Sequence, residues 1–514
     1  MNKYDGIDPI NVGTGYDVSI KKLAIKISKS VGYSGKIKWD KSKPDGVARK
    51  LLDISKISRL GFKPRVDLKD GIERTVNEFN NLKKKGNFYI KNYPKLKKDF
   101  FVNEITPSIK KYIGKNYKYF FFNKKKYWYP LSLPTYNKQE INQALDSMTK
   151  YRTTMWKKTD KFEKKFSRSL KSKHAVMVNS GSSSDLLMSF GILDKTLNYL
   201  KKGDEIIIPI LTWPTHIWSA MMAGFKVKLV DINLKSLNID IDQLKKNITK
   251  KTKAIFLVHA LGNPCNMDKI KKIAKEKKLI ILEDCCEALG SKFGGKYVGN
   301  FGLAASYSFF FSHHISTMEG GMVVTNNKKF YKNLKYLRSH GWRRGYIEKS
   351  KSNIDVYDNF KFVNWGFNLR PTELQAGFGI EQMKKLKKFN LIRKKYYNLF
   401  VSTFKNNKNI YFPSVEKKSD PSWFAIPIIL NKDSNFSRKK LLNYLEKNGI
   451  ETRPIIVGNL ARHPVGKIFN EFSSRKFPNA DYIHNRGFYI GLSPLIQKSN
   501  FIKMINIFKK FFIK

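Results

Sequence analysis

A pair of adjacent histidines, His313 and His314, stands out in this chain of 514 residues, within the stretch SFFFSHHISTMEGGMVVT (308–325). An apolar run precedes the pair, and a Glu-Gly-Gly turn and a second apolar run follow it. This pattern predicts that the pair lies at the end of a buried strand. Because imidazole gives and takes protons near neutral pH, the pair is a candidate for acid–base chemistry. A histidine packed in the core is the structural alternative.

Three other stretches offer groups that could hold a ligand. In VNSGSSSDLL (178–187) a predicted strand turns through Gly and Ser into a helix, whose first N–H groups suit a phosphate. LEDCCEALGS (282–291) places Asp284 at a strand end, where its carboxylate could pair with a protonated ring nitrogen. LTWPTH (211–216) places Trp213 at another strand end, where it could stack on a flat ring. Each has a plain alternative as a helix cap or core residue, but together they indicate pyridoxal phosphate.

The elements that must position these groups recur at regular intervals. Short apolar runs occur at EIIIPIL, KVKLVDI, AIFLVHA, LIILEDC, SYSFFF and GMVVT (205–211, 226–232, 254–260, 279–285, 306–311 and 321–325). Segments of helical spacing separate them, so the pattern predicts an α/β fold with the sheet covered on both faces. Strands become fewer after about residue 385, which predicts a smaller C-terminal domain.

At this level of detail, residues 127–514 resemble the sugar-nucleotide aminotransferases of the DegT/DnrJ/EryC1/StrS family. The resemblance runs through SGSSSDLL, PILTWPTH, HALGNP, LEDCCEALGS, SFFFSHHISTMEGGMVVT, GFNLRPTELQAGFG and ETRPIIVGNL. It implies a fold-type I pyridoxal-phosphate-dependent transferase, with a mixed, mostly parallel sheet covered by helices and a smaller C-terminal α+β domain.

The resemblance also implies roles for individual residues. It assigns phosphate binding to Gly181, Ser182 and Ser308. It places Trp213 on the ring, Asp284 at the pyridine nitrogen and Glu287 beside the ring. Asn368 matches an asparagine that reaches the phosphate from the other subunit, which implies a homodimer with a composite active site. No metal site is expected.

Most family members carry a lysine six residues before the Glu/Asp-Gly-Gly turn, where it holds the cofactor as a Schiff base. Counting back six residues from Glu319 gives His313, and no lysine lies between Lys296 and Lys328. Since imidazole cannot form that Schiff base, we expect an untethered cofactor and His313 as the base. His314 takes this role if the alignment slips by one residue.

This departure resembles the sugar 3-dehydratase branch of the family. The branch implies a lyase that uses pyridoxamine phosphate to remove the C3 hydroxyl of a 4-keto-6-deoxy nucleotide-sugar, with glutamate as amino donor, in deoxysugar and lipopolysaccharide synthesis. One kind acts on a CDP-sugar and carries an iron–sulfur cluster on four cysteines; this chain has three cysteines, too few for it. The other kind acts on GDP-4-keto-6-deoxymannose and needs no cluster. SHHISTMEGG and LRSHGW (337–342) resemble this kind, which implies GDP-4-keto-6-deoxymannose as substrate, whereas HALGNP and SDPSWF (419–424) resemble the CDP kind. An ordinary sugar-nucleotide aminotransferase and a catalytically silent binding protein remain as alternatives.

Four segments are predicted along the chain. Residues 9–82 resemble the C-terminal part of GDP-L-fucose synthase, an extended short-chain dehydrogenase, but lack its dinucleotide-binding half. They form the first segment, 1–82, where GKIKW (35–39) predicts a strand and VDLKDGIERTVNEF (66–79) a helix. A lysine- and aromatic-rich linker (83–126), a cofactor-binding domain (127–385) and a small domain (386–514) follow. Whether 1–126 is functional or a fusion remnant stays open.

Bulk composition limits the remaining possibilities. The formal net charge is +58, and the excess is spread along the chain, so general lysine enrichment explains it better than a nucleic-acid site. The field would nonetheless steer an anionic nucleotide-sugar. No apolar run reaches membrane-spanning length. The three cysteines, Cys265, Cys285 and Cys286, suit no disulfide framework, and a cytoplasmic location is expected.

Overall fold

The computed structural model describes residues 11, 14–39, 51–84, 127–194, 197–343, 360–469, 472 and 476–513. The chain divides into two compact units, Met1–Pro107 and Ser108–Lys514. Most of the predicted linker, residues 83–126, lies outside the described residues. Among the helices of the described ranges, none is both long and apolar enough to cross a membrane.

The first unit contains three helices, α1 (Ile20–Ser30), α2 (Ser55–Arg59) and α3 (Leu68–Lys84). The helix predicted within residues 66–79 is confirmed by α3. The strand predicted at residues 35–39 is wrong, because this stretch has no regular structure. It has no neighbouring strand among the described residues to complete its backbone hydrogen bonds.

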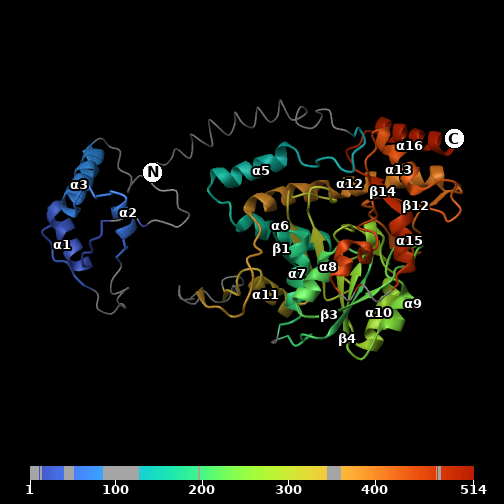
Figure 1. Ribbon diagram of the computed structural model, residues 1–514, viewed down its shortest axis with the longest axis horizontal. Helices are drawn as coiled ribbons and strands as arrows, with labels where there is room; N and C mark the ends of the chain where they lie inside the picture. Colours follow the sequence, from blue (N-terminus) through green and yellow to red (C-terminus); the bar gives the residue numbers. More distant parts are fainter. Residues whose placement is uncertain are drawn as a thin grey trace. The chain divides into compact units, whose positions relative to one another are not determined.

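The second unit is built on a seven-stranded sheet in the order β1-β9-β8-β5-β4-β2-β3. Figure 1 labels β1, β3 and β4 of this sheet. Its strands are β1 (His174–Val178), β2 (Glu205–Pro209), β3 (Lys226–Val230), β4 (Thr252–Val258), β5 (Ile280–Asp284), β8 (Ala304–Ser308) and β9 (Gly321–Thr325). Only β9 runs antiparallel to its neighbours β1 and β8. The mixed, mostly parallel sheet of the predicted α/β fold is confirmed. Each predicted run overlaps one of these strands, although β4 and β8 each begin two residues before the predicted run.

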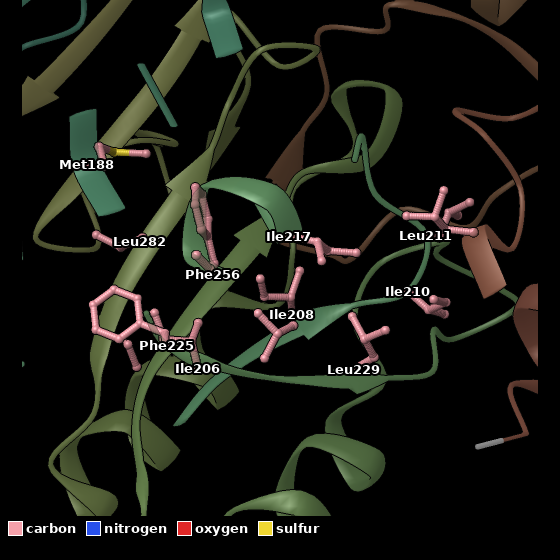
Figure 2. Close-up of a cluster of buried hydrophobic side chains, with 14 of the residues drawn as sticks. Met188, Ile206, Ile208, Ile210, Leu211, Ile217, Phe225, Leu229, Phe256 and Leu282 are labelled. Atoms are coloured by element: carbon pink, nitrogen blue, oxygen red, sulfur yellow. The ribbon is translucent and has the colours of Figure 1, made fainter. Parts of the chain in front are cut away.

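Helices cover both faces of this sheet. One face meets α7 (Gly181–Gly191), α8 (Thr215–Met222) and α11 (Lys328–Leu337). The other meets α6 (Lys157–Ser169), α9 (Ile241–Asn247), α10 (Met267–Lys277) and α12 (Glu373–Phe404). Alternation along β2 explains this, because Ile206 and Ile208 enter the first core while Ile207 enters the other. Figure 2 shows the first core, where β2–β5 pack against Met188 and Ile217 of the covering helices.

A second, antiparallel sheet lies in the C-terminal region, in the order β10-β12-β14-β13. Its strands are β10 (Ile410–Tyr411), β12 (Ala425–Leu430), β13 (Thr452–Arg453) and β14 (Gly487–Gly491), accompanied by α13 (Arg438–Lys447), α15 (Pro478–Arg486) and α16 (Lys498–Ile513). A small third sheet joins β6 (Lys292–Phe293), β7 (Lys296–Tyr297) and β11 (Ser419–Asp420), and α5 (Lys138–Thr149) packs on α12. The predicted boundary at residue 385 falls inside α12, and Tyr129 belongs to the C-terminal hydrophobic cluster.

A buried ion network ties β1, the strand that leads into the Gly-Ser turn, to two helices. Glu163 of α6 accepts hydrogen bonds from the Met177 N–H (2.8 Å) and from Arg338 Nη1 (2.6 Å), and Lys335 lies 3.1 Å away. Arg338 also donates to the Met177 carbonyl at 2.7 Å. Burial alone would raise the pKa of Glu163, but Lys335 and Arg338 hold the pKa below its ordinary value. The carboxylate therefore stays charged and fixes β1.

Replacing Glu163 with Gln should cost about 3 kcal/mol of unfolding free energy, because two buried cations lose their counter-charge. Urea denaturation of the whole chain measures this. Asp268→Asn is the matched control: the Asp268–Lys418 pair is close, at 2.7 Å, but about 60% exposed, so its loss should cost less than ~1 kcal/mol. Equal losses in both variants would contradict the role assigned to burial.

Candidate active site

A cavity of about 470 Å³ opens where β1, β2, β5 and β8 end. These strands run parallel, and ligands in such sheets bind at the carboxyl ends. The cavity is lined by seven of the predicted site residues: Gly181, Ser182, Trp213, Asp284, Glu287, Ser308 and His313. Four separate segments, one at the end of each strand, supply them, so the fold gathers groups that lie up to 132 positions apart (313 − 181).

The N-terminus of α7 forms one end of the cavity. Ser180 caps the helix through its side chain, which accepts from the Ser183 N–H. The N–H groups of Gly181 and Ser182 have no protein partner among the described residues. A Cβ on Gly181 would lie 2.6 Å from the Ser308 Cβ, so only glycine lets that hydroxyl approach the helix end. Free N–H groups, a hydroxyl and a helix dipole together suit a phosphate group.

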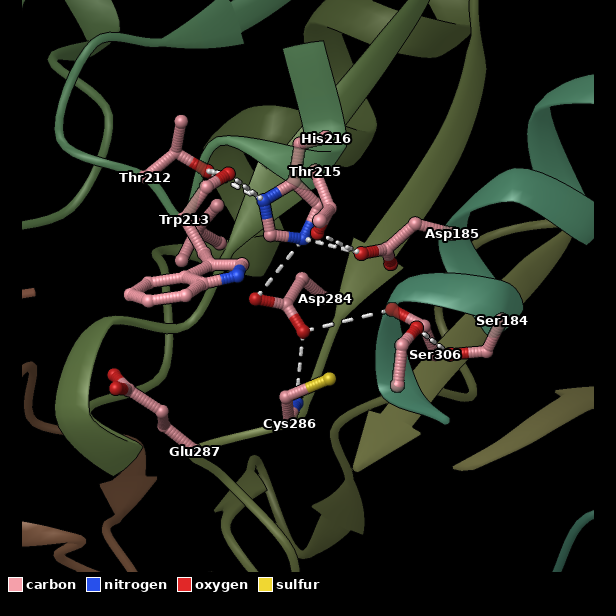
Figure 3. Close-up of polar contacts among 12 residues, drawn as sticks. Ser184, Asp185, Thr212, Trp213, Thr215, His216, Asp284, Cys286, Glu287 and Ser306 are labelled. Atoms are coloured by element: carbon pink, nitrogen blue, oxygen red, sulfur yellow. Dashed lines mark hydrogen bonds and ion pairs between the residues drawn. The ribbon is translucent and has the colours of Figure 1, made fainter. Parts of the chain in front are cut away.

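Next to this end, Trp213 and Asp284 provide a ring-binding surface. The Trp213 side chain is 54% exposed although it lines a cavity, which leaves its flat face free for a ligand. The Asp284 Oδ1 accepts from the Cys286 N–H at 2.8 Å, and Oδ2 lies 3.2 Å from His216 Nε2 (Figure 3). Burial opposes ionisation of Asp284, but His216 and Cys286 lower its pKa, so the carboxylate is anionic. It suits a protonated ring nitrogen.

His216 is the centre of a buried charge network. Its Nε2 also lies 3.5 Å from Asp185, and its Nδ1 contacts the Trp213 carbonyl at 3.0 Å. Burial alone would lower the pKa of His216, but Asp185 and Asp284 outweigh it and raise the pKa to about 9. The three side chains have the spacing of a metal site. The imidazolium already supplies the positive charge between the two carboxylates, so the geometry requires no metal.

A second group with metal-ligand spacing, His259, Glu283 and Cys285, is occupied by internal hydrogen bonds. The His259 Nδ1 accepts from the Cys265 N–H at 3.0 Å, and Nε2 faces Glu283 at 3.2 Å. Both ring nitrogens are therefore used. Glu283 also accepts from N–H groups in the loop that follows β7, so this group has a structural role.

Glu287 supplies a carboxyl group that titrates near neutrality. Its Oε2 accepts from the Leu261 N–H at 2.9 Å. Burial is the largest cause that raises its pKa, with Asp284 adding to it, to about 7. Glu287 can thus donate or accept a hydrogen bond beside a bound ring.

The two histidines of the pair have different surroundings. His313 lines the cavity, and its Nδ1 lies 2.9 Å from the Cys286 carbonyl. A carbonyl only accepts, so Nδ1 carries the proton and the neutral ring keeps its lone pair on Nε2. His314 is fully buried, bonds the Ser422 carbonyl through Nε2 and does not line the cavity. The geometry favours His313 as the base.

Asn368 lies apart from the cavity. It lines a second pocket with Arg370, Trp342 and Ser339, and its side-chain oxygen accepts from Arg370 Nε at 2.9 Å. Within one subunit, the structure therefore does not bring Asn368 to the other predicted residues.

The donor set fits pyridoxal phosphate, and the comparisons with known proteins agree. The family model described as "DegT/DnrJ/EryC1/StrS aminotransferase family" matches residues 134–509. The chain belongs to this family.

Individual proteins and solved structures are also similar to this chain. The chain is 40% identical over 369 residues to GDP-4-keto-6-deoxy-D-mannose 3-dehydratase of Escherichia coli O55:H7, covering 71% of this chain and 95% of that protein. A structure of a His-to-Asn variant of GDP-4-keto-6-deoxymannose-3-dehydratase with bound GDP-perosamine superposes with TM-score 0.69 at 37% identity, covering 74% and 99% of the two chains. The structure of GDP-4-keto-6-deoxymannose-3-dehydratase with a trapped PLP-glutamate geminal diamine gives the same TM-score, identity and coverage.

Sequence reasoning did not assign His216, Asp185 or Arg453, which also line the cavity. Local sequence patterns could have identified two of these residues. Asp185 lies one helical turn after Gly181, on the same face of α7, and His216 lies three residues after Trp213, in the first turn of α8. Arg453 lies in ETRPIIVGNL, one of the stretches that carry the family resemblance, but no role was assigned to it, because β13 reaches the cavity only through the C-terminal sheet.

We predict that His216 makes stability depend on pH. Its pKa is about 9 in the fold and ordinarily 6.5, so its stabilising charge is complete below pH 6.5 and is lost as pH rises to 9. The unfolding free energy of the cofactor-free protein should fall more steeply over this range than in His216→Gln. Urea denaturation at several pH values measures the slopes.

The control is His174→Gln. Burial lowers the pKa of His174, so removing it should leave the slope above pH 6.5 unchanged. A slope that is the same in the parent protein and in His216→Gln would refute the charged state of His216.

Proposed function

We propose that the chain is a pyridoxamine-phosphate-dependent lyase that removes the C3 hydroxyl of GDP-4-keto-6-deoxymannose. One observation carries the proposal: an imidazole, His313, lies in the cavity at the family's lysine position, with Nδ1 bonded to the Cys286 carbonyl. The 40% identity to a 3-dehydratase over nearly its whole length supports the substrate assignment.

Each residue of the cavity has a task in this reaction. The N-terminus of α7 and Ser308 would hold the phosphate, Trp213 would cover the ring and Asp284 would keep the ring nitrogen protonated. The cofactor supplies a primary amine for the sugar's keto carbon and an electron-withdrawing ring. The pKa of His313, lowered mainly by burial to about 4, leaves the imidazole neutral, so Nε2 can remove a proton and later return it.

The overall reaction balances with glutamate as reductant. The sugar loses one oxygen at C3, where a C–O bond is replaced by C–H, and gains two electrons. Glutamate loses two electrons and leaves as 2-oxoglutarate, and its nitrogen is released as ammonia. Because no amine of the chain recaptures the cofactor at position 313, hydrolytic release of ammonia competes well with amino transfer.

The first test incubates the chain with GDP-4-keto-6-deoxymannose, glutamate and pyridoxal phosphate and weighs the product. We expect a sugar lighter by one oxygen atom, together with free ammonia. His313→Asn should lower turnover at least about 100-fold, as removal of a general base does, and should leave cofactor absorbance unchanged. If the product were an amino sugar, the chain would be an aminotransferase. If no product formed, the chain would be a binding protein without catalytic activity.

His313→Lys is the matched control. Borohydride should fix the cofactor covalently to His313→Lys, because the new amine can form a Schiff base, and should leave the parent protein unmodified. Peptide mass spectrometry detects the adduct. Covalent fixation in the parent protein would mean that another amine holds the cofactor, and the proposed chemistry would fail.

We further propose that two subunits share each active site, with Asn368 completing the phosphate site of its neighbour. The support is its position: Asn368 lies outside its own cavity, at the end of a segment with exposed apolar side chains. Phe360, Phe362, Val363 and Trp365 are each at least 50% exposed. Such a surface is typical of a subunit contact.

Mixing two inactive variants tests this arrangement. His313→Asn lacks the base, and Asn368→Asp places a carboxylate against the phosphate, so each variant alone should be inactive. Subunit exchange creates dimers with one intact site, and activity should return to about a quarter of the parent value. No recovery, despite mixed dimers shown by native mass spectrometry, would place both residues in one subunit.

We also propose that residues 127–514 form the catalytic part, divided near residue 385, and that 1–126 is a separate addition. The support is that the family model begins at residue 134. A cytoplasmic location stays a prediction.

A further inference from the structure

Arg393 of α12 is a buried cation without a counter-charge. Its side chain is 3% exposed, and no carboxylate lies within 4.0 Å of it among the described residues. One nitrogen, Nη1, donates to the Phe424 carbonyl at 2.8 Å, and Nε has no partner in the described part of the chain. An unpaired buried charge is costly, so its retention points to a function beyond packing.

The segment that Arg393 binds also contacts both histidines. The Phe424 ring lies 5.2 Å from the His313 ring and 6.1 Å from the His314 ring. The Ser422 carbonyl accepts from His314 Nε2 at 2.9 Å. Residues 422–424 thus connect the guanidinium to the histidine pair, and Phe424 itself lines the cavity.

The groups around His313 have opposite effects on its pKa. Acidic side chains line the same cavity: Asp185, Asp284, Glu287 and Glu319. Asp284 and the Cys286 carbonyl raise the pKa of His313, whereas burial, the largest cause, and Arg393 lower it. Imidazolium His216 and Arg453 are the cationic side chains on the cavity wall. Arg393 therefore adds to burial in opposing the carboxylates, which favour the protonated imidazole.

We propose that Arg393 is a positioning residue for the base: its hydrogen bond to the Phe424 carbonyl holds residues 422–424 against the histidine pair, and its buried charge disfavours the protonated form of His313. This rests on the proposed function only in naming His313 as the base. When His313 accepts a proton, repulsion from Arg393 favours release of that proton. The imidazole therefore returns to its neutral form after each proton transfer.

The test compares Arg393→Lys, which keeps the charge, with Arg393→Met, which removes it at similar length. Diethyl pyrocarbonate reacts with neutral imidazole, and peptide mass spectrometry follows its rate at His313 against pH in the cofactor-free chain. The midpoint for His313 should rise by about one pH unit in Arg393→Met and stay near the parent value in Arg393→Lys. The acid limb of kcat/KM for the sugar should move in parallel. The midpoint at His174 serves as an internal control.

An unmoved His313 midpoint in Arg393→Met would overturn the proposal, and Arg393 would then be structural. If Arg393→Met fails to fold, Arg393→Gln is measured in its place, and an unmoved midpoint there has the same meaning. If the midpoint moves but His313→Asn remains fully active, the electrostatic role stands and the base assignment fails. The two proposals are therefore separable.

Discussion

The hydrogen bond from His313 Nδ1 to the Cys286 carbonyl is the contact on which the chemistry of this site depends. It decides which ring nitrogen holds the proton, and so leaves Nε2 as the basic atom. The carbonyl belongs to the loop directly after β5, two residues beyond Asp284. The groups for the ring nitrogen and for the base are thus held by one short segment. A shift of this loop would change the ring charge and the base together.

The electrostatic design of the cavity follows from its acidic wall. A cofactor with a protonated ring nitrogen needs an anion beneath it, and Asp284 stays anionic because His216 bonds it. The carboxylates on the wall favour protonation of the base, His313. Burial of His313 and the unpaired Arg393 on α12 oppose this by lowering its pKa. A carboxylate that serves the cofactor and a cation that protects the base are consequences of the same requirement.

The strands could be predicted from local patterns, and so could the Gly-Ser turn, Trp213 and Asp284 at strand ends. Glu287, Ser308 and the position of His313 as the base came from the family resemblance, since no local pattern assigns them a role. His216 and Asp185 lay within the same patterns but were not predicted, since their roles depend on a charge network between α7, α8 and β5 that no local pattern encodes. Arg393 could not be found at all: it lies in a long helix among many basic residues, and only burial distinguishes it. The strand expected at residues 35–39 failed because a strand needs a partner, which a propensity does not supply.

Replacing a lysine with a histidine at the cofactor position changes more than the tether. A lysine there is both the base and the amine that reclaims the cofactor, so proton transfer and covalent recapture are coupled in one atom. An imidazole separates them: it moves protons at Nε2 but forms no bond to the cofactor's carbon. In the proposed arrangement the cofactor would then be held without a covalent bond, by groups such as the α7 N-terminus, Ser308, Trp213 and Asp284. A histidine can therefore serve as the base only because non-covalent contacts in this cavity replace the covalent bond that a lysine would form.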